Sequence, residues 1–216
     1  MDVEQYMTAD VITVTEDTLV VDALNLMEQH DFHRLPVVRD GKLVGLLTER
    51  VVLDHSSNLA TGRDIHEINY LLTKTRVSQI MKKNVPTIKK NVLLEEAARI
   101  MRDDNLHVLP VVDDENHVVG IITYKDIFKA FIDMTGYNDP GSRLVLEIPE
   151  DHPGILEDIT NILAEANISI THIFVNRKGQ FSEITLQVDK ESVEEVAELL
   201  RYQGYTVLRA QTNPNQ

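Results

Sequence analysis

Two stretches of the chain repeat the same pattern of apolar and polar positions. In each, a short apolar segment leads into a helix whose apolar residues fall at i, i+3, i+4 and i+7, the spacing of one buried helical face. Two short apolar strands joined by a turn follow, and then a second helix, so each stretch predicts the order β-α-β-β-α. Thr48 and Thr123 precede the second helices, where a hydroxyl can cap free backbone amides.

The two stretches also match residue by residue. The matched segments are Met7–Val14 with Met81–Ile88, His33–Val38 with His107–Val112, and Val44–Arg50 with Val119–Lys125. A repeat of this length indicates one structural unit used twice, with each copy burying a face against the other. Met27 and Met101 occupy equivalent places on the apolar helix face, and we expect them to fill the core.

A different pattern follows the segment 135–142, in which two glycines, a proline and small polar residues indicate a linker or sharp turn. The linker is short, and a hinge is expected at Gly136 or Gly141. The remainder predicts the order β-α-β-β-α-β. Its elements are expected at Leu144–Ile148, Ile155–Ala166, Ile168–Val175, Phe181–Val188, Glu191–Tyr202 and Tyr205–Leu208. Pro153 is expected near the first position of the first helix.

Composition narrows the function mainly by exclusion. Hydrophobic residues make up 43% of the 216 residues and charged residues 26%, which is ordinary for a folded globular protein. The net charge of −14 argues against a nucleic-acid partner, because DNA and RNA are polyanions. The densest basic run, Lys82-Lys83, is interpreted as solvated surface lysines, as is Lys89-Lys90.

Several classes of site and location are also not expected. The absence of cysteine excludes disulfides and thiolate metal sites and favours a reducing cytoplasm. No apolar run approaches the roughly 20 residues that span a bilayer, and the first residues lack the features of a signal peptide. The chain has no His-Glu-x-x-His, no glycine-rich phosphate loop and no nucleophile elbow, so neither catalytic residues nor a catalytic cofactor or metal is expected.

The repeated unit resembles the CBS domain, and the two copies resemble a CBS pair, or Bateman module, over about residues 1–135. The C-terminal part resembles the ACT domain, a ferredoxin-like fold, through Asp151–Leu156 and Ala166–Ile170. A CBS pair followed by an ACT domain is similar to the AcuB proteins, named for acetoin utilisation. The implied fold is α/β (α+β). Its parts are CBS repeat 1 at 1–60, a connecting helix at 61–76, CBS repeat 2 at 77–134, a linker at 135–142 and the ACT domain at 143–212.

The resemblance implies a site for an adenine nucleotide. In CBS pairs, a Thr or Ser followed three residues later by Asp contacts phosphate and ribose. The second copy has Thr123 and Asp126, whereas the first has Thr48 but Val51, whose side chain cannot accept a hydrogen bond from a ribose diol. The site around Asp126 is therefore expected to be the stronger one. The backbone around Val85-Pro86-Thr87 is the expected adenine edge.

His33-Arg34 resembles the His-Arg pair that meets nucleotide phosphates in the CBS subunit of the energy-sensing kinase. Arginine suits this role because its planar fork engages two phosphate oxygens. The second copy has His107 but Val108. Ordinary structural roles remain open for all of these residues: Thr48 and Thr123 as helix caps, Asp126 as a partner of the helix dipole, Arg34 in a surface ion pair and His107 packed at a strand end.

The ACT resemblance implies a second ligand. ACT domains in many proteins bind an amino acid at a domain–domain interface, which implicates Asp151, His152, Gly154 and Ile155. The turn there precedes a helix whose free amides could meet a ligand, although a plain turn cap is the alternative. The family often has an asparagine, whose amide helps to hold the ligand, where this chain has Ser169.

These features favour a cytoplasmic regulatory sensor that binds an adenine nucleotide such as AMP, ADP or ATP and couples this binding to the ACT domain. The alternative is an interaction protein with degenerate CBS sites, which Val51 and Val108 favour. A homodimer is expected, because pairing of either domain type would hide apolar surface. The sequence leaves open which nucleotide binds, which protein is regulated and which pathway is involved.

Overall fold

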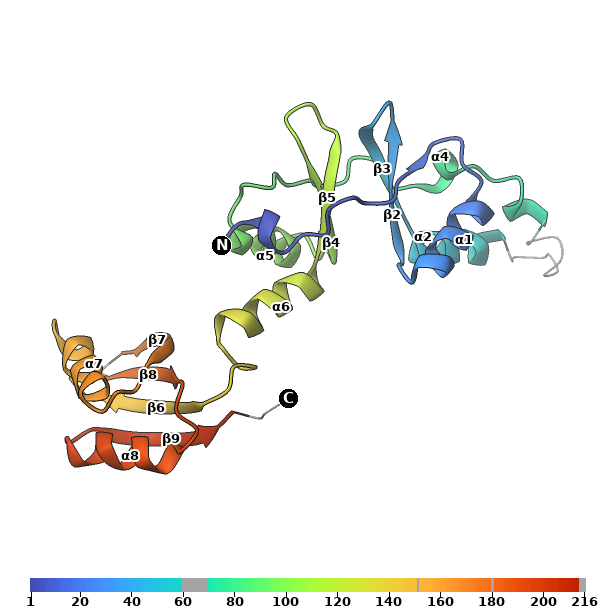
Figure 1. Ribbon diagram of the computed structural model, residues 1–216. Coiled ribbons are helices and arrows are strands. Elements are labelled where there is room, and N and C mark those ends of the chain that lie inside the picture. Colours follow the sequence, from blue (N-terminus) through green and yellow to red (C-terminus); the bar gives the residue numbers. More distant parts are fainter. Residues whose placement is uncertain (60–69, 151, 180, 214–216) are drawn as a thin grey trace. The chain divides into compact units, whose positions relative to one another are not determined.

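The computed structural model describes residues 1–59, 70–150, 152–179 and 181–213. The chain divides into two compact units, Met1–Ile127 and Phe128–Gln216 (Figure 1). Both mix helices and strands, which confirms the predicted fold class. The connecting helix expected at 61–76 falls largely on residues outside the described ranges.

The first copy of the repeat forms a three-stranded sheet with its helices. Its elements are η1 (Val3–Gln5), β1 (Val14–Thr15), α1 (Val20–His30), β2 (Arg34–Arg39), β3 (Lys42–Thr48) and α2 (Glu49–Leu59). Strand β2 pairs in parallel with β1 and antiparallel with β3. The apolar face of α1 is buried, and Met27 is only 1% exposed, which confirms its predicted place in the core.

The second copy repeats this arrangement with one difference. Its elements are α4 (Val77–Ile80), α5 (Leu94–Asp103), β4 (Val108–Val112), β5 (Val118–Thr123) and α6 (Tyr124–Met134). Where the first copy has β1, the second has a single parallel bridge from Ile88 to Val111, because only one residue pair is in register. Met101 is buried, as predicted.

The opening segment of each copy pairs with a strand of the other copy. Thr8 exchanges two backbone hydrogen bonds of 2.9 Å with Ile121 of the second copy. Lys82 makes the equivalent pair with Leu46 of the first copy, at 2.9 and 3.0 Å. Figure 1 shows the same exchange at the start of the chain, where η1 lies beside α5. The two copies are therefore joined through their backbones, and Val77 and Met81 also pack in the core cluster of the first copy.

Two glycines permit this close approach. A Cβ atom on Gly45 would lie 2.8 Å from the carbonyl oxygen of Lys82, and one on Gly120 would lie 3.1 Å from that of Thr8. Both would also meet the sulfur of a methionine in the opposite segment at 2.6 Å. The matched glycines of the two copies are thus explained by sterics at equivalent crossings.

The second unit contains a four-stranded antiparallel sheet. Its elements are β6 (Ser142–Ile148), α7 (Ile155–Glu165), β7 (Ile170–Lys178), β8 (Phe181–Val188), α8 (Val193–Tyr202) and β9 (Thr206–Thr212), and the strand order is β7-β8-β6-β9. One core cluster joins inward residues of β6 and β8 to α7 and α8, so both helices cover the same face. Helix α7 begins at Ile155 with Gly154 as its N-cap at φ 102°, so Pro153 precedes the helix instead of opening it.

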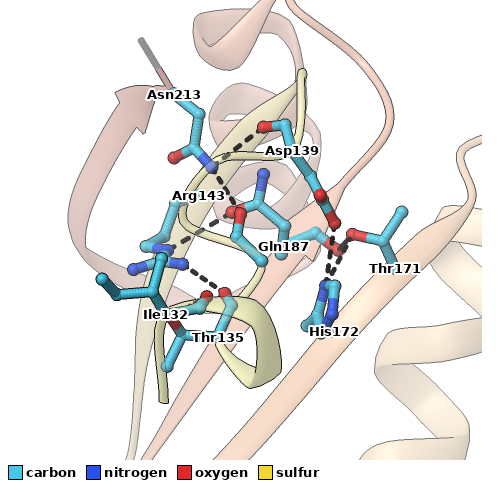
Figure 2. A network of polar contacts seen from close by, with 9 residues as sticks. Ile132, Thr135, Asp139, Arg143, Thr171, His172, Gln187 and Asn213 are labelled. Carbon is cyan, nitrogen blue, oxygen red and sulfur yellow. Dashed lines mark hydrogen bonds and ion pairs between the residues drawn. The ribbon is translucent and has the colours of Figure 1, made fainter. Parts of the chain in front are cut away.

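The segment 135–142 is fastened to this sheet by a polar network (Figure 2). The side-chain amide of Asn213 donates to the carbonyl oxygens of Gly136 and Asp139, at 2.9 and 3.1 Å. Arg143 donates to the carbonyl oxygen of Thr135. A Cβ atom on Gly136 would collide with the ring of His172. These contacts give Gly136 a packing role, and they do not support the expected hinge.

Candidate functional site

A cleft of about 430 Å³ lies between the two copies of the repeat. It brings together six of the residues selected from the sequence: His33, Arg34, Thr48, Val85, Pro86 and His107. Strand β3 and the start of α2 supply one wall. The segment 82–86 supplies another, held there by the backbone pairing of Lys82 with Leu46. The exchange of opening segments therefore builds the cleft.

The wall at the start of α2 is ordered by local hydrogen bonds. The hydroxyl oxygen of Thr48 accepts from the backbone N–H of Val51 at 3.2 Å, which confirms its predicted role as a helix cap. Glu49 donates its backbone N–H to the carbonyl oxygen of His33 at 3.1 Å. Its carboxylate also lies 2.9 Å from Nδ1 of the same histidine. The end of β2 is thereby fixed against the start of the helix.

The cleft is rich in positive charge. Arg34, Arg50, Lys82 and Lys83 line it, whereas Glu49 is the one carboxylate among its lining residues. The interpretation of Lys82-Lys83 as plain surface lysines therefore missed their position: both are exposed, but they face the first copy across the cleft. The signal available in the sequence was their match to Thr8-Ala9, since the second copy's opening segment carries charge where the first copy's has none.

Thr123 and Asp126 lie elsewhere in the first unit. The carboxylate oxygen Oδ2 of Asp126 accepts from the backbone N–H of Thr123 at 2.7 Å and from its hydroxyl at 2.8 Å. The acid therefore caps α6. The hydroxyl of Thr123 donates to this carboxylate and does not cap a helix amide as Thr48 does. Neither Thr123 nor Asp126 lines the cleft that contains Val85 and Pro86. Asp126 and Val85 therefore do not share this cleft, because the segment 82–86 crosses to the opposite copy, and the role of Asp126 in nucleotide binding stays a prediction.

The remaining residues selected in the CBS pair have separate surroundings. Thr87 lines a neighbouring hollow of about 440 Å³ together with Arg39 and Asn116. The ring of His107 packs edge-on against Tyr124, with ring centroids 5.5 Å apart. His107 thus combines the packing role with a place at the cleft.

The second unit has a hollow of about 530 Å³ at the start of α7. His152, Gly154 and Ile155 line it, as do Glu157 and Arg177, which the sequence reasoning did not select. Asp151 lies outside the described residues. Ser169 is not among the lining residues, and its backbone N–H donates to the Asp189 carboxylate at 2.9 Å. The lining of the hollow thus combines charged side chains with apolar ones.

No group of three or more histidine, cysteine, aspartate or glutamate side chains within the described ranges is arranged to hold a metal ion. No helix in the same part of the chain is long and apolar enough to cross a membrane.

Comparison with known proteins gives matches to two families. The CBS-domain family matches residues 3–58 and 77–133, and the ACT-domain family matches residues 142–204. An uncharacterized protein of Methanocaldococcus jannaschii is 36% identical over 134 residues, which are 60% of this chain and 46% of that protein. The chain spans less than half the length of the first curated relatives that it matches.

Solved structures that resemble the CBS part include two CBS-pair proteins. An AcuB protein of Vibrio cholerae, assigned to acetoin utilization, is 28% identical with a TM-score of 0.52, covering 62% of this chain and 91% of that one. The Arabidopsis thaliana protein CBSX2, solved in complex with AMP, is 28% identical with a TM-score of 0.51, covering 61% of this chain and 96% of that one.

Proposed function

We propose that this chain, which belongs to the CBS-domain family and ends in an ACT domain, is a regulatory protein that binds an adenine nucleotide between its two CBS copies. The observation that carries the proposal is the cleft formed by β3, the start of α2 and the crossed segment 82–86. Its volume of about 430 Å³ lies within the usual range for small-molecule sites. The complex of CBSX2 with AMP supports an adenine-type ligand.

The Thr123 side of the pair is a second candidate position. The hydrogen bonds from Thr123 to the Asp126 carboxylate both use Oδ2, which leaves Oδ1 for a ribose diol. In the first copy, Val51 stands at this position and cannot accept such a bond. We therefore expect unequal sites, with one strong nucleotide site per chain: the cleft has the cations for phosphate, and the Thr123 side has the carboxylate for ribose.

We further propose that the nucleotide influences the ACT domain through α6. This helix begins beside the Asp126 cap, continues past the division at Ile127, and leads into the segment that Asn213 fastens to the ACT sheet. An amino acid in the hollow at α7 would be the second ligand. Linkage requires each ligand to change the affinity of the other by the same factor.

A homodimer is proposed from two exposed apolar side chains. Leu53 on α2 is 63% exposed and Phe128 on α6 is 61% exposed, and the two occupy equivalent positions in the repeat. Burial of such side chains against a second copy would stabilise a symmetric pair. Light scattering tests this proposal, and a mass near 24.5 kDa at micromolar concentration would contradict it.

Thermal denaturation with AMP, ADP, ATP and S-adenosylmethionine tests the proposed function. A ligand at a hundredfold its Kd should stabilise the fold by about 2.7 kcal/mol, and calorimetry should then give one strong site per chain. If none of the four ligands raises the melting temperature, the alternative of an interaction protein with degenerate CBS sites is favoured.

A further inference from the structure

We infer that the cleft beside Thr48 selects a nucleoside carrying two or more phosphates. The inference rests on the proposed function and adds the class of nucleotide and the groups that recognise it. Two features of the cleft carry it: an excess of cations over acids, and the loss of that excess at the equivalent positions of the second copy.

The cations of the cleft have few partners of their own. Arg34, Lys82 and Lys83 make no ion pair within the described ranges. Arg50 pairs with Asp54 at 3.3 Å, but both side chains are largely exposed, and pairs of this kind contribute little. The one acid of the cleft, Glu49, is already engaged by His33. In a chain of net charge −14, these uncompensated cations mark a place suited to a polyanion.

The number of cations matters for the choice of ligand. A single phosphate can engage one or two of them and leaves the others unpaired. A di- or triphosphate presents more oxygens and more charge, and arginine and lysine bind phosphate by different geometries. Four cations therefore favour a polyphosphate over a monophosphate, an unphosphorylated nucleoside or a ligand with a positive charge.

The second copy provides an internal comparison on the same backbone. Of the four cations, only one is matched by a cation at its equivalent position. The equivalents of Lys82, Lys83 and Arg50 are Thr8, Ala9 and Lys125, and that of Arg34 is Val108, which lines the same cleft. Among the other lining residues, Asn84 and Asn105 correspond to the acids Asp10 and Asp31, whereas Glu49 corresponds to the neutral Tyr124. The fold itself does not require the positive charge, and the Thr123 side is unsuited to a polyphosphate.

The other lining residues favour a nucleoside over phosphate alone. Leu46 and Val108 are apolar and buried, and Val85 and Pro86 add further apolar surface to the lining. A flat base can pack against such surfaces while the phosphates reach the cations. The lining thus combines apolar and cationic side chains, as an amphipathic ligand requires.

Repeat-matched substitutions test the inference in the full-length chain. The double variant Lys82→Thr/Lys83→Ala gives the cleft the residues that the first copy's own opening segment carries. Arg34→Val gives it the equivalent residue of the second copy. A double variant at exposed lysines outside the cleft, Lys90→Ala/Lys190→Ala, removes the same charge and is the control.

Calorimetry with ATP, ADP, AMP, adenosine and pyrophosphate gives the readout. The wild type should bind ADP and ATP about tenfold or more tighter than AMP, since a hydrogen bond to a charged group contributes about one to two powers of ten in affinity. The cleft variants should lose this preference, and their ADP binding should depend less on salt. The control should retain both. Unchanged melting temperatures would show that the cleft variants remain folded.

Three outcomes separate the inference from the proposed function. If AMP or adenosine binds as tightly as ADP and ATP, or the cleft variants keep the preference, the inference is wrong and nucleotide binding stands. If pyrophosphate binds as tightly as ADP, the cleft recognises phosphate without a nucleoside, and the inference is also wrong. If no adenine ligand binds at all, the proposed function itself fails.

Discussion

Substitution of Gly45 by alanine should disturb the contact between β3 and the segment 82–86 while leaving the rest of the fold intact. The new Cβ would lie 2.8 Å from the carbonyl oxygen of Lys82 and 2.6 Å from the sulfur of Met81. The methionine can move, because it is flexible. The carbonyl oxygen belongs to a backbone that is tied to Leu46 by two hydrogen bonds, so the segment 82–86 must shift.

The magnitude follows from those contacts. An added methyl group in a tightly packed place costs about 1–3 kcal/mol of unfolding free energy. Weakening two backbone hydrogen bonds accounts for a similar amount, at about 0.5–1.5 kcal/mol each. These are two views of the same displacement, so we expect a total loss of about 1–3 kcal/mol. The matched substitution Gly120→Ala should cost less, since its backbone contact would be 3.1 Å.

Urea denaturation and nucleotide calorimetry of the two variants test this reasoning together. Gly45→Ala should lower both stability and affinity, because the displaced segment carries Val85 and Pro86 into the cleft wall. Gly120→Ala should lower stability with a smaller effect on affinity, since it disturbs the opposite crossing. Full stability of Gly45→Ala would refute the close approach. Equal losses of affinity in both variants would refute the assignment of the cleft to one crossing.

Three further outcomes are expected. Asn213→Ala removes two hydrogen bonds of a buried amide and should cost about 1–3 kcal/mol in urea denaturation, whereas an unchanged midpoint would show that the segment 135–142 is not held by them. Asp126→Ala removes a helix cap and should cost about 0.5–2 kcal/mol by the same assay, while Asp126→Asn should retain part of it. A hydrogen bond from the backbone N–H of His117 holds the pKa of Asp113 below its ordinary value. The ionised Asp113 carboxylate therefore stabilises the fold above about pH 4, and this stabilisation is lost as the pH falls through the lowered pKa of the folded state. Asp113→Asn should therefore flatten the acid limb of a melting-temperature profile, and an unchanged limb would contradict this.

The architecture of the CBS pair could be predicted because the same pattern occurs twice in the sequence. Apolar spacing and matched segments fixed the elements of each copy, and even the left-handed residues recur: Asp10 and Asn84 have φ angles of 53° and 54°. Aspartate and asparagine are the non-glycine residues that tolerate this conformation best. Helices, strands and turns could therefore be predicted wherever they depend on residues close together in the sequence.

The site was predicted less well, because it depends on contacts between copies. A repeat shows that two segments are equivalent, but it does not show which copy's strand each segment meets. Val85 and Asp126 line different parts of the pair for this reason. Lys82 and Lys83 were missed for a related one: an exposed lysine at a turn has the same sequence signature whether it faces bulk solvent or a cleft.

The crossed segments also set an order in which the chain can be completed during synthesis. Thr8 leaves the ribosome early, but its partner Ile121 is made more than a hundred residues later, and the partner of Leu46 is likewise still to come. The cleft cannot form while only the first copy has emerged, because residues 82–86 and 105–108 supply part of its lining. A ribosome-bound first copy would therefore expose the backbone N–H and carbonyl of Leu46 without their partner Lys82, and nucleotide could assist folding only after the second copy is released.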